Sequence, residues 1–223
     1  MDLAITIADW VFFLSIIAAF IVSIIHREKK DLRPIQLYII VTLLADVFLE
    51  SVEILPKNSS ALLISNVVLN IYSLFEISLI SYFLYKIIKG KRYRTIILVF
   101  LLIYLLTCLF IWTGKHKALF YVVPQLFGIE NLLITISCLF YISEALNSDS
   151  IENLQSNSNF IVICGLMFCF SVMTPLSFSY FIWNYAAPDL NKIVQIIEMI
   201  FYSLLFVSLI KAFLCQFPER KQL

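Results

Sequence analysis

Seven apolar runs of about 20 residues each constrain the fold of this chain more than any other feature. A helix rises 1.5 Å per residue, so about 20 apolar residues cross the roughly 30 Å hydrocarbon core of a bilayer. The run 96–112 is apolar on every face, whereas strands of a membrane barrel alternate apolar and polar residues. The sequence therefore predicts an all-α polytopic membrane protein, a bundle of seven transmembrane helices over residues 4–25, 35–55, 61–86, 95–113, 118–143, 160–183 and 191–215.

The composition agrees with a membrane location. Hydrophobic residues make up 61% of the 223-residue chain and charged residues only 14%, whereas about a quarter of a soluble domain is charged. A net charge of +1 excludes a basic surface for nucleic acid. The segments between the runs are short, so we expect a single transmembrane domain over residues 1–223.

The distribution of Lys and Arg predicts the orientation in the membrane. If the N-terminus is outside, the inner segments hold twelve of these residues and the outer segments four. Inner loops of membrane proteins carry the excess of positive charge, so the N-terminus is expected outside and the C-terminus inside. The twelve are Arg27, Lys29, Lys30, Arg33, Lys86, Lys89, Lys91, Arg92, Arg94, Lys211, Arg220 and Lys221.

Seven carboxyl groups fall inside the predicted spans: Asp9, Asp46, Glu50, Glu53, Glu76, Glu130 and Glu198. Ionisable residues in a span are costly and face a bundle interior or a wet cavity. Polar residues form stripes on the second, third, fifth and seventh helices. The fourth and sixth helices have almost no polar residues and are expected to face lipid on most sides. Carboxyl groups without cationic partners in a low-dielectric medium favour the protonated form. We therefore expect an acidic, partly protonated cavity that opens to the outside.

The candidate ligand- or proton-binding residues are Asp46, Glu50, Glu53, Asn70, Glu76, Glu130, Asn131 and Glu198. The first three are spaced i, i+4 and i+7, so they share one face of the second helix. An alternative interpretation is structural, because neutral Glu and Asn side chains also join membrane helices by hydrogen bonds.

Several chemistries are excluded by the residues that the spans lack. The two histidines, His26 and His116, lie in loops on opposite sides, so no zinc site or histidine-activated nucleophile is expected within the spans. The five cysteines are scattered and are expected to act as small hydrophobic residues rather than to form disulfides or a metal cluster. Pro124 is expected to kink the fifth helix. We expect no catalytic residues, no metal site and no cofactor.

Three stretches, 70–86 (NIYSLFEISLISYFLYK), 159–176 (NFIVICGLMFCFSVMTPL) and 202–215 (YSLLFVSLIKAFLC), carry a resemblance to known proteins. The chain resembles an uncharacterised group of seven-helix integral membrane proteins of Bacteroidota. This resemblance implies a multi-pass protein of the bacterial inner membrane. It implies no activity, although Glu76 falls within the first matching stretch.

The sequence favours a receptor- or sensor-like module that binds a small or cationic ligand in an outward-facing acidic cavity. A proton- or cation-coupled small-molecule transporter is the alternative, because unpaired membrane acids suit proton relays. A metal-free intramembrane lipid hydrolase, with two carboxyl groups as general acid and base, is the third possibility. The expected partners are membrane lipids and a cytosolic or membrane signalling protein, with no nucleic acid.

Overall fold

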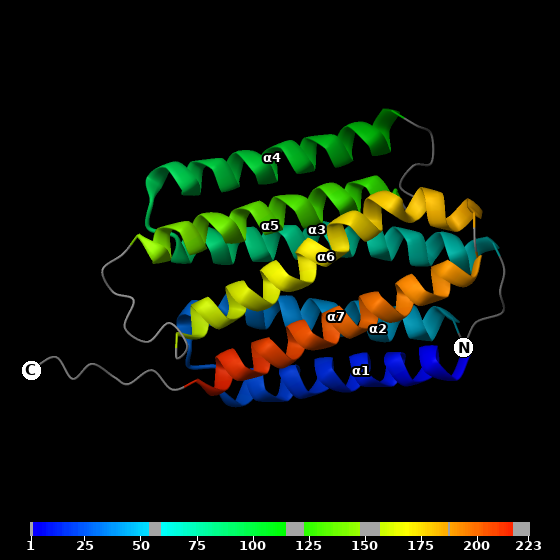
Figure 1. Ribbon diagram of the computed structural model, residues 1–223, viewed down its shortest axis with the longest axis horizontal. Coiled ribbons are helices and arrows are strands. Elements are labelled where there is room, and N and C mark those ends of the chain that lie inside the picture. Colours follow the sequence, from blue (N-terminus) through cyan, green and yellow to red (C-terminus); the bar gives the residue numbers. More distant parts are fainter. Residues whose placement is uncertain (1, 54–58, 115–122, 148–156, 187, 216–223) are drawn as a thin grey trace, which may run out of the picture.

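The computed structural model describes residues 2–53, 59–114, 123–147, 157–186 and 188–215. Within these ranges the chain forms seven long α-helices and one short 3-10 helix, η1 (Figure 1). Each of the seven is long and apolar enough to cross a membrane, which confirms the prediction of an all-α fold and is consistent with a bundle of seven transmembrane helices. The helices are α1 Asp2–Ile25, η1 Lys30–Leu32, α2 Arg33–Glu53, α3 Ser59–Ile87, α4 Lys91–Gly114, α5 Pro124–Leu146, α6 Ser158–Ala186 and α7 Pro188–Leu214.

Successive helices run in opposite directions along the bundle (Figure 1). The N-terminus lies at one end, here called the N end, and α7 finishes at the opposite end, here called the C end. Helices α2, α4 and α6 therefore finish at the N end, where α3, α5 and α7 begin. A helix satisfies most of its backbone hydrogen bonds internally, so backbone groups without helical partners lie mainly at the two ends of the bundle.

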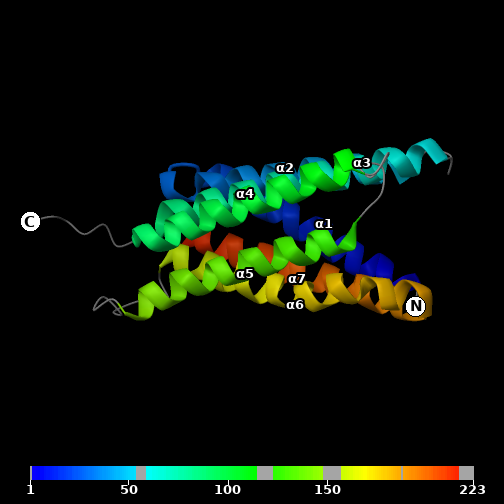
Figure 2. The same ribbon diagram turned by 90° about the horizontal axis from the view of Figure 1, so that it is seen from above.

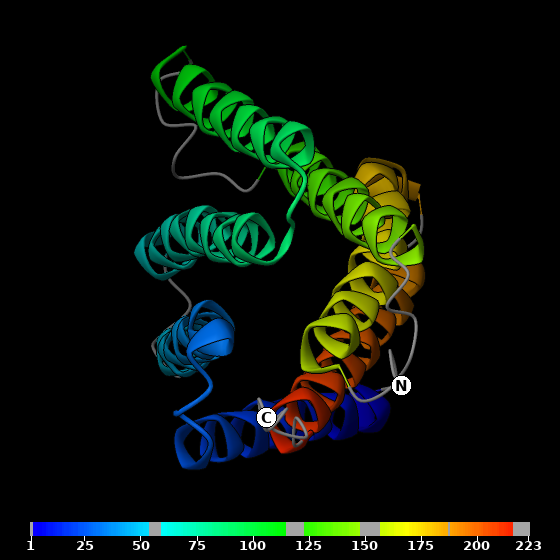
Figure 3. The same cartoon turned by 90° about the vertical axis from the view of Figure 1, so that its left-hand side faces the viewer.

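Six of the helices form a ring, and α4 lies outside it (Figure 3). Around the ring α1 packs against α2, α2 against α3, α3 against α5, α5 against α6, α6 against α7, and α7 against α1. Helix α4 packs against α3 and α5 from outside. Seen from above, α2, α3 and α4 form one side of the molecule and α5, α6 and α7 the other (Figure 2).

The expectation that the fourth and sixth helices face lipid agrees with the structure only for α4. Exposed apolar side chains such as Leu102 and Phe110 cover the outer face of α4. Helix α6 instead packs between α5 and α7 and buries Val162, Leu166 and Phe170. The expectation was wrong for α6 because an apolar helix face packs equally well against lipid and against other apolar helices.

Pro124 begins α5 and does not kink it, contrary to the expectation from the sequence. It occupies the first turn of the helix, where the missing N–H of proline leaves no hydrogen bond unmade. Helix α5 therefore runs from Pro124 to Leu146, and residues 118–122 of the expected span lie outside the described residues. The proline that lies inside a helix is Pro175 of α6, and α6 changes direction in this region (Figure 1).

The half of the bundle toward the C end is filled by tightly packed apolar side chains, here called the plug. Its members come from α2, α3, α6 and α7, and each is at most 1% exposed. The ring of Tyr38 stacks on that of Phe206, with centroids 6.3 Å apart and an interplanar angle of 10°. The main members are Tyr38, Ile80, Phe83, Leu166, Phe170, Phe206, Leu209 and Phe213.

Helices α6 and α7 approach each other closely at Gly165. A Cβ atom at this position would collide with the side chain of Ser208 and would lie 3.3 Å from Leu205 Cδ1. Small residues allow membrane helices to pack at short separations, where dispersion contacts are most numerous. The absence of a side chain at Gly165 therefore holds α6 against α7 beside the plug.

Several basic residues that indicate orientation also make structural contacts at the C end. The Nζ atom of Lys29 donates hydrogen bonds to the carbonyl oxygens of Ala212, at 3.2 Å, and of Cys215. It therefore caps the last turn of α7 from the connection between α1 and η1. Burial lowers the pKa of the Lys29 ammonium below its usual value. Arg94 Nε donates to the carbonyl of Ile88 at 2.5 Å, beyond the last residue of α3.

Glu144 closes the turn between α3 and α4 at the same end. Its carboxylate accepts the backbone N–H of Lys89 at 2.9 Å and that of Gly90 at 3.2 Å. These donors precede the first residue of α4, so the negative charge also faces the positive end of the α4 dipole. The end of α5, which carries Glu144, is thereby joined to the start of α4.

Candidate functional site

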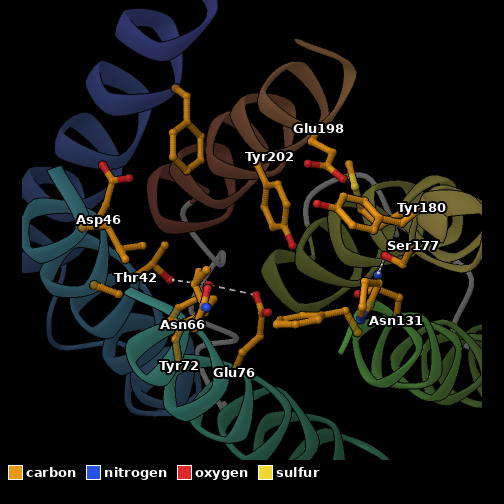
Figure 4. Close-up of a pocket in the computed structure, with 17 residues that line it drawn as sticks. Thr42, Asp46, Asn66, Tyr72, Glu76, Asn131, Ser177, Tyr180, Glu198 and Tyr202 are labelled. Carbon is orange, nitrogen blue, oxygen red and sulfur yellow. Dashed lines mark hydrogen bonds between the residues drawn. The ribbon is translucent and has the colours of Figure 1, made fainter. Parts of the chain in front are cut away.

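A cavity of about 620 Å³ lies inside the ring of six helices (Figure 4). Every helix of the ring contributes to its wall, whereas α4 contributes none of the lining residues. The 17 lining residues are Phe12, Thr42, Ala45, Asp46, Leu49, Asn66, Leu69, Tyr72, Glu76, Pro124, Phe127, Asn131, Met173, Ser177, Tyr180, Glu198 and Tyr202.

The cavity occupies the half of the bundle toward the N end. Its lining residues lie in the later parts of α2 and α6 and in the first parts of α3, α5 and α7, which all meet at that end. Leu49 of α2 and Pro124 of α5 are the lining residues closest to their helix ends. The plug fills the bundle on the other side of the cavity. The cavity is therefore separated from the C end by packed apolar side chains.

Glu76 lies where the cavity meets the plug. Its Oε1 atom accepts a hydrogen bond from the hydroxyl of Tyr38 and another from that of Tyr72, both at 3.0 Å. The Tyr72 hydroxyl also lies 3.1 Å from Thr42 Oγ1, which donates to the backbone carbonyl of Tyr38 at 2.9 Å. Because Tyr38 belongs to the plug, these hydrogen bonds connect the floor of the cavity with the core that closes it.

The cavity wall combines carboxyl groups with aromatic rings. Asp46, Glu76 and Glu198 come from three different helices and line different parts of the same cavity (Figure 4). Five aromatic side chains line the wall, and no lining residue is Lys or Arg. Neutral polar groups complete it, and Asn131 Nδ2 donates to Ser177 Oγ at 3.1 Å. The five aromatic residues are Phe12, Tyr72, Phe127, Tyr180 and Tyr202.

The structure brings four of the eight candidate residues together in this cavity: Asp46, Glu76, Asn131 and Glu198. Helices α1 and α6 also contribute to the wall, although the sequence placed the cavity among the second, third, fifth and seventh helices only. The difference arises because Phe12, Met173 and Tyr180 are apolar or aromatic, and such residues do not stand out in an apolar span.

Two candidate residues, Asn70 and Glu130, are buried outside the lining of the cavity. Glu130 of α5 is fully buried and points toward α3 and α4. Its Oε2 accepts hydrogen bonds from Ser73 and, at 3.1 Å, from the Tyr104 hydroxyl. Ser73 and Tyr104 also lie 2.5 Å apart through their hydroxyl oxygens. Glu130 therefore joins three helices by hydrogen bonds, which agrees with the structural interpretation of the intramembrane acids.

The two oxygens of Glu130 have different surroundings. Within the described ranges, Oε1 is buried without a hydrogen-bond partner, whereas Oε2 accepts two. An amide can keep its oxygen at the Oε2 position, so Glu130→Gln should change the free energy of unfolding by less than about 1 kcal/mol. Glu130→Ala removes the acceptor and leaves a void, so it should destabilise the protein by about 2 kcal/mol or more. Unfolding in graded detergent mixtures measures both; equal losses would contradict the assigned hydrogen bonds.

The last two candidates, Glu50 and Glu53, lie in the final turn of α2, at the N end of the bundle. Glu50 lines a second cavity, which lies between α1 and α2 and also contains Asp9 and Asp46. The side chain of Glu53, at the last residue of α2, lies outside the described residues. Among the side chains that the structure describes, no group of three or more His, Cys, Asp or Glu is placed to hold a metal ion.

Sequence reasoning missed the tyrosines that organise the site. Tyr72 and Glu76 are four residues apart on α3, and Tyr38 and Thr42 have the same spacing on α2, so each pair shares a helix face. A tyrosine hydroxyl inside an apolar span needs a hydrogen-bond partner. A search for Tyr one turn from an intramembrane acid would have found Tyr72, next to Glu76, and Tyr202, next to Glu198, whereas Tyr38 and Tyr180 carry no such signal.

The comparisons with known proteins do not assign a function to this site. No protein-family model matches the chain, and no curated protein or solved structure is significantly similar to it.

Proposed function

We propose that the protein is a receptor-like membrane module that binds a small organic cation in the central cavity. The observation that carries this proposal is the wall itself, because three carboxyl groups and five aromatic side chains line one cavity and no basic residue lines it. Carboxylates supply opposite charge, and the faces of aromatic rings attract cations. A wall of this kind favours an ammonium group that carries apolar substituents.

The size of the cavity and the spread of its acids support an organic ligand. Small-molecule sites enclose about 300–1,000 Å³, and the cavity measures about 620 Å³. A metal ion needs several ligands at 2.0–2.6 Å, and the described side chains offer no such group. An organic cation can instead contact the acids one or two at a time and fill the remaining space against the rings.

In the orientation that we propose for the chain, the cavity faces the outside of the membrane. The described Lys and Arg residues of the inner segments, from Arg27 to Lys211, lie at the C end of the bundle, and cytoplasmic segments carry such an excess. We place the N end outside, in the bacterial inner membrane. Ligand binding would then shift helices against the plug, and the basic C end would meet anionic lipids or a cytosolic signalling partner.

Binding of phenyltrimethylammonium to the protein in lipid nanodiscs tests this function. We expect saturable binding, and at least about tenfold weaker affinity for Asp46→Asn and for Glu198→Gln, because each loses a charge on the cavity wall. Glu28→Gln removes an exposed charge outside the helices and is the matched control. Affinity that is unchanged in both cavity variants would contradict the proposal.

A proton- or cation-coupled carrier is the second candidate, favoured by the hydrogen bonds between Glu76 and Tyr38. They connect the cavity to the plug, which a carrier would have to open toward the C end. Proteoliposomes with an internal pH dye distinguish the two functions. A carrier moves protons with the cation, and Glu76→Gln removes this flux, whereas a receptor binds the cation without flux.

A further inference from the structure

The second cavity, of about 550 Å³, lies between the N-end halves of α1 and α2. Two residues, Phe12 and Asp46, line both this cavity and the central one. The two spaces therefore adjoin at this pair of side chains, and the second cavity lies at the periphery of the ring. The remaining lining residues are Thr6, Asp9, Trp10, Phe13, Val47, Glu50, Ser51 and Met199.

The second cavity reaches the outer surface of the bundle. Trp10 on α1 is 61% exposed and Val47 on α2 is 45% exposed. Both belong to helices long and apolar enough to span a membrane, so their exposed faces are directed at lipid. The central cavity thus has a neighbour that is accessible from the side of the bilayer.

The lining of the second cavity is amphiphilic. Asp9, Asp46 and Glu50 supply carboxyl groups, whereas Trp10, Phe13 and Met199 supply apolar surface. A soluble cation needs no apolar route through lipid, and a neutral lipid chain needs no acids. A molecule with a cationic head and one alkyl chain matches this lining, because the head can contact the carboxyl groups and the chain the apolar side chains. Such a molecule can also occupy both cavities at the same time.

We propose that the ligand is a single-chain cationic amphiphile that reaches the central cavity from the outer leaflet by passing between α1 and α2. Its ammonium head passes Asp46 into the central cavity, and its chain remains in the second cavity between Trp10 and Val47. Asp46 and Phe12 stand at the passage, since they line both spaces. This inference rests on the proposed function and specifies its ligand class.

Quenching of Trp10 fluorescence tests the position of the chain. The protein has three tryptophans, and the variant Trp112→Phe/Trp183→Phe leaves Trp10 alone. In nanodiscs, 12-bromododecyltrimethylammonium should quench Trp10 with a saturable component, because the bromoalkyl chain lies in the second cavity. The neutral probe 12-bromododecanol partitions into the same lipid and should give only quenching that rises linearly with concentration.

Matched variants test the route. Val47→Phe should reduce the saturable quenching at least about fivefold by filling the second cavity. Val99→Phe, on α4, replaces a side chain of the same type and the same 45% exposure away from the cavity, and should leave the quenching unchanged. Equal saturable quenching by the charged and neutral probes, or equal effects of the two valine variants, would overturn the inference.

The outcome for the amphiphile can be separated from that for the proposed function. If phenyltrimethylammonium binds and loses affinity in Asp46→Asn, but the bromoalkyl probe gives no saturable quenching of Trp10, the ligand enters from water and only the lateral route is wrong. If neither probe binds saturably, the proposed function fails together with its ligand class.

Discussion

Replacing Tyr38 by alanine is expected to lower the free energy of unfolding by about 3–5 kcal/mol, the usual cost of removing a fully buried aromatic side chain. Tyr38 is 0% exposed, stacks on Phe206 and donates a hydrogen bond to Glu76. The alanine variant loses the ring from the plug and the hydrogen bond from the floor of the cavity. Unfolding followed by far-ultraviolet circular dichroism in graded detergent mixtures measures the loss.

Tyr38→Phe separates the ring from the hydroxyl. It keeps the stacking on Phe206 and leaves Glu76 with the hydrogen bond from Tyr72, so a loss of only about 1 kcal/mol is expected. If phenylalanine destabilises the protein as much as alanine does, the hydrogen bond and not the packing holds the plug. If neither variant destabilises it, Tyr38 does not belong to a packed core.

Gly165→Ala is expected to destabilise the protein by about 2 kcal/mol, because overpacking of a close contact typically costs 1–3 kcal/mol. The added methyl group would collide with Ser208 on α7, so either Ser208 must move or α6 and α7 must separate. Alanine is otherwise the better helix former, so the intrinsic propensity of the helix predicts the opposite sign. Thermal unfolding of both proteins in the same detergent shows directly whether Gly165→Ala lowers or raises the stability.

The double variant Gly165→Ala/Ser208→Gly assigns the loss to this contact. Removing the Ser208 side chain gives the new methyl group room, so the second substitution should cost less in the Gly165→Ala background than in the wild type. A coupling free energy of about 1 kcal/mol or more is expected from residues in direct contact. Additive effects would place the cause of the destabilisation elsewhere in α6.

The number and length of the helices could be predicted because they depend on local sequence alone. A span must be apolar over about 20 residues to cross the bilayer, and this requirement is visible in any window of the chain. The expected span 35–55 and the observed helix α2, Arg33–Glu53, differ by two residues at each end. The start of α4 differs by four residues and that of α5 by six, the largest displacement. The start of α5 was displaced because Val123 and Pro124 follow an apolar stretch that the hydropathy pattern does not separate from the helix.

The partners of each intramembrane acid could not be predicted in the same way. Hydropathy marks Glu76 and Glu130 equally, yet Glu76 lines the cavity and Glu130 is enclosed by Ser73 and Tyr104. The difference depends on how far each helix is rotated about its axis and on which neighbours it meets. Those quantities are set by packing between helices distant in sequence, such as α3 and α5, and no local pattern encodes them.

The position of the cavity was partly accessible from the sequence. Asp46 and Glu198 mark the α2 and α7 walls because ionisable groups in a span face a cavity or the bundle interior. The aromatic half of the wall was not accessible, because Phe12 and Phe127 have the same hydropathy whether they face a ligand, the core or lipid. The chemistry that favours an organic cation therefore became visible only when acids and rings were seen together.

Displacement of labelled phenyltrimethylammonium from the protein in nanodiscs, by choline and by 3,3-dimethylbutan-1-ol, tests most directly whether the cavity recognises positive charge. The two competitors have nearly the same shape, and only choline carries the charge. If Asp46, Glu76 and Glu198 recognise an organic cation, choline should displace the label at concentrations at least about 30-fold lower, a difference of about 2 kcal/mol. Equal potency of the two competitors would contradict charge recognition by the cavity.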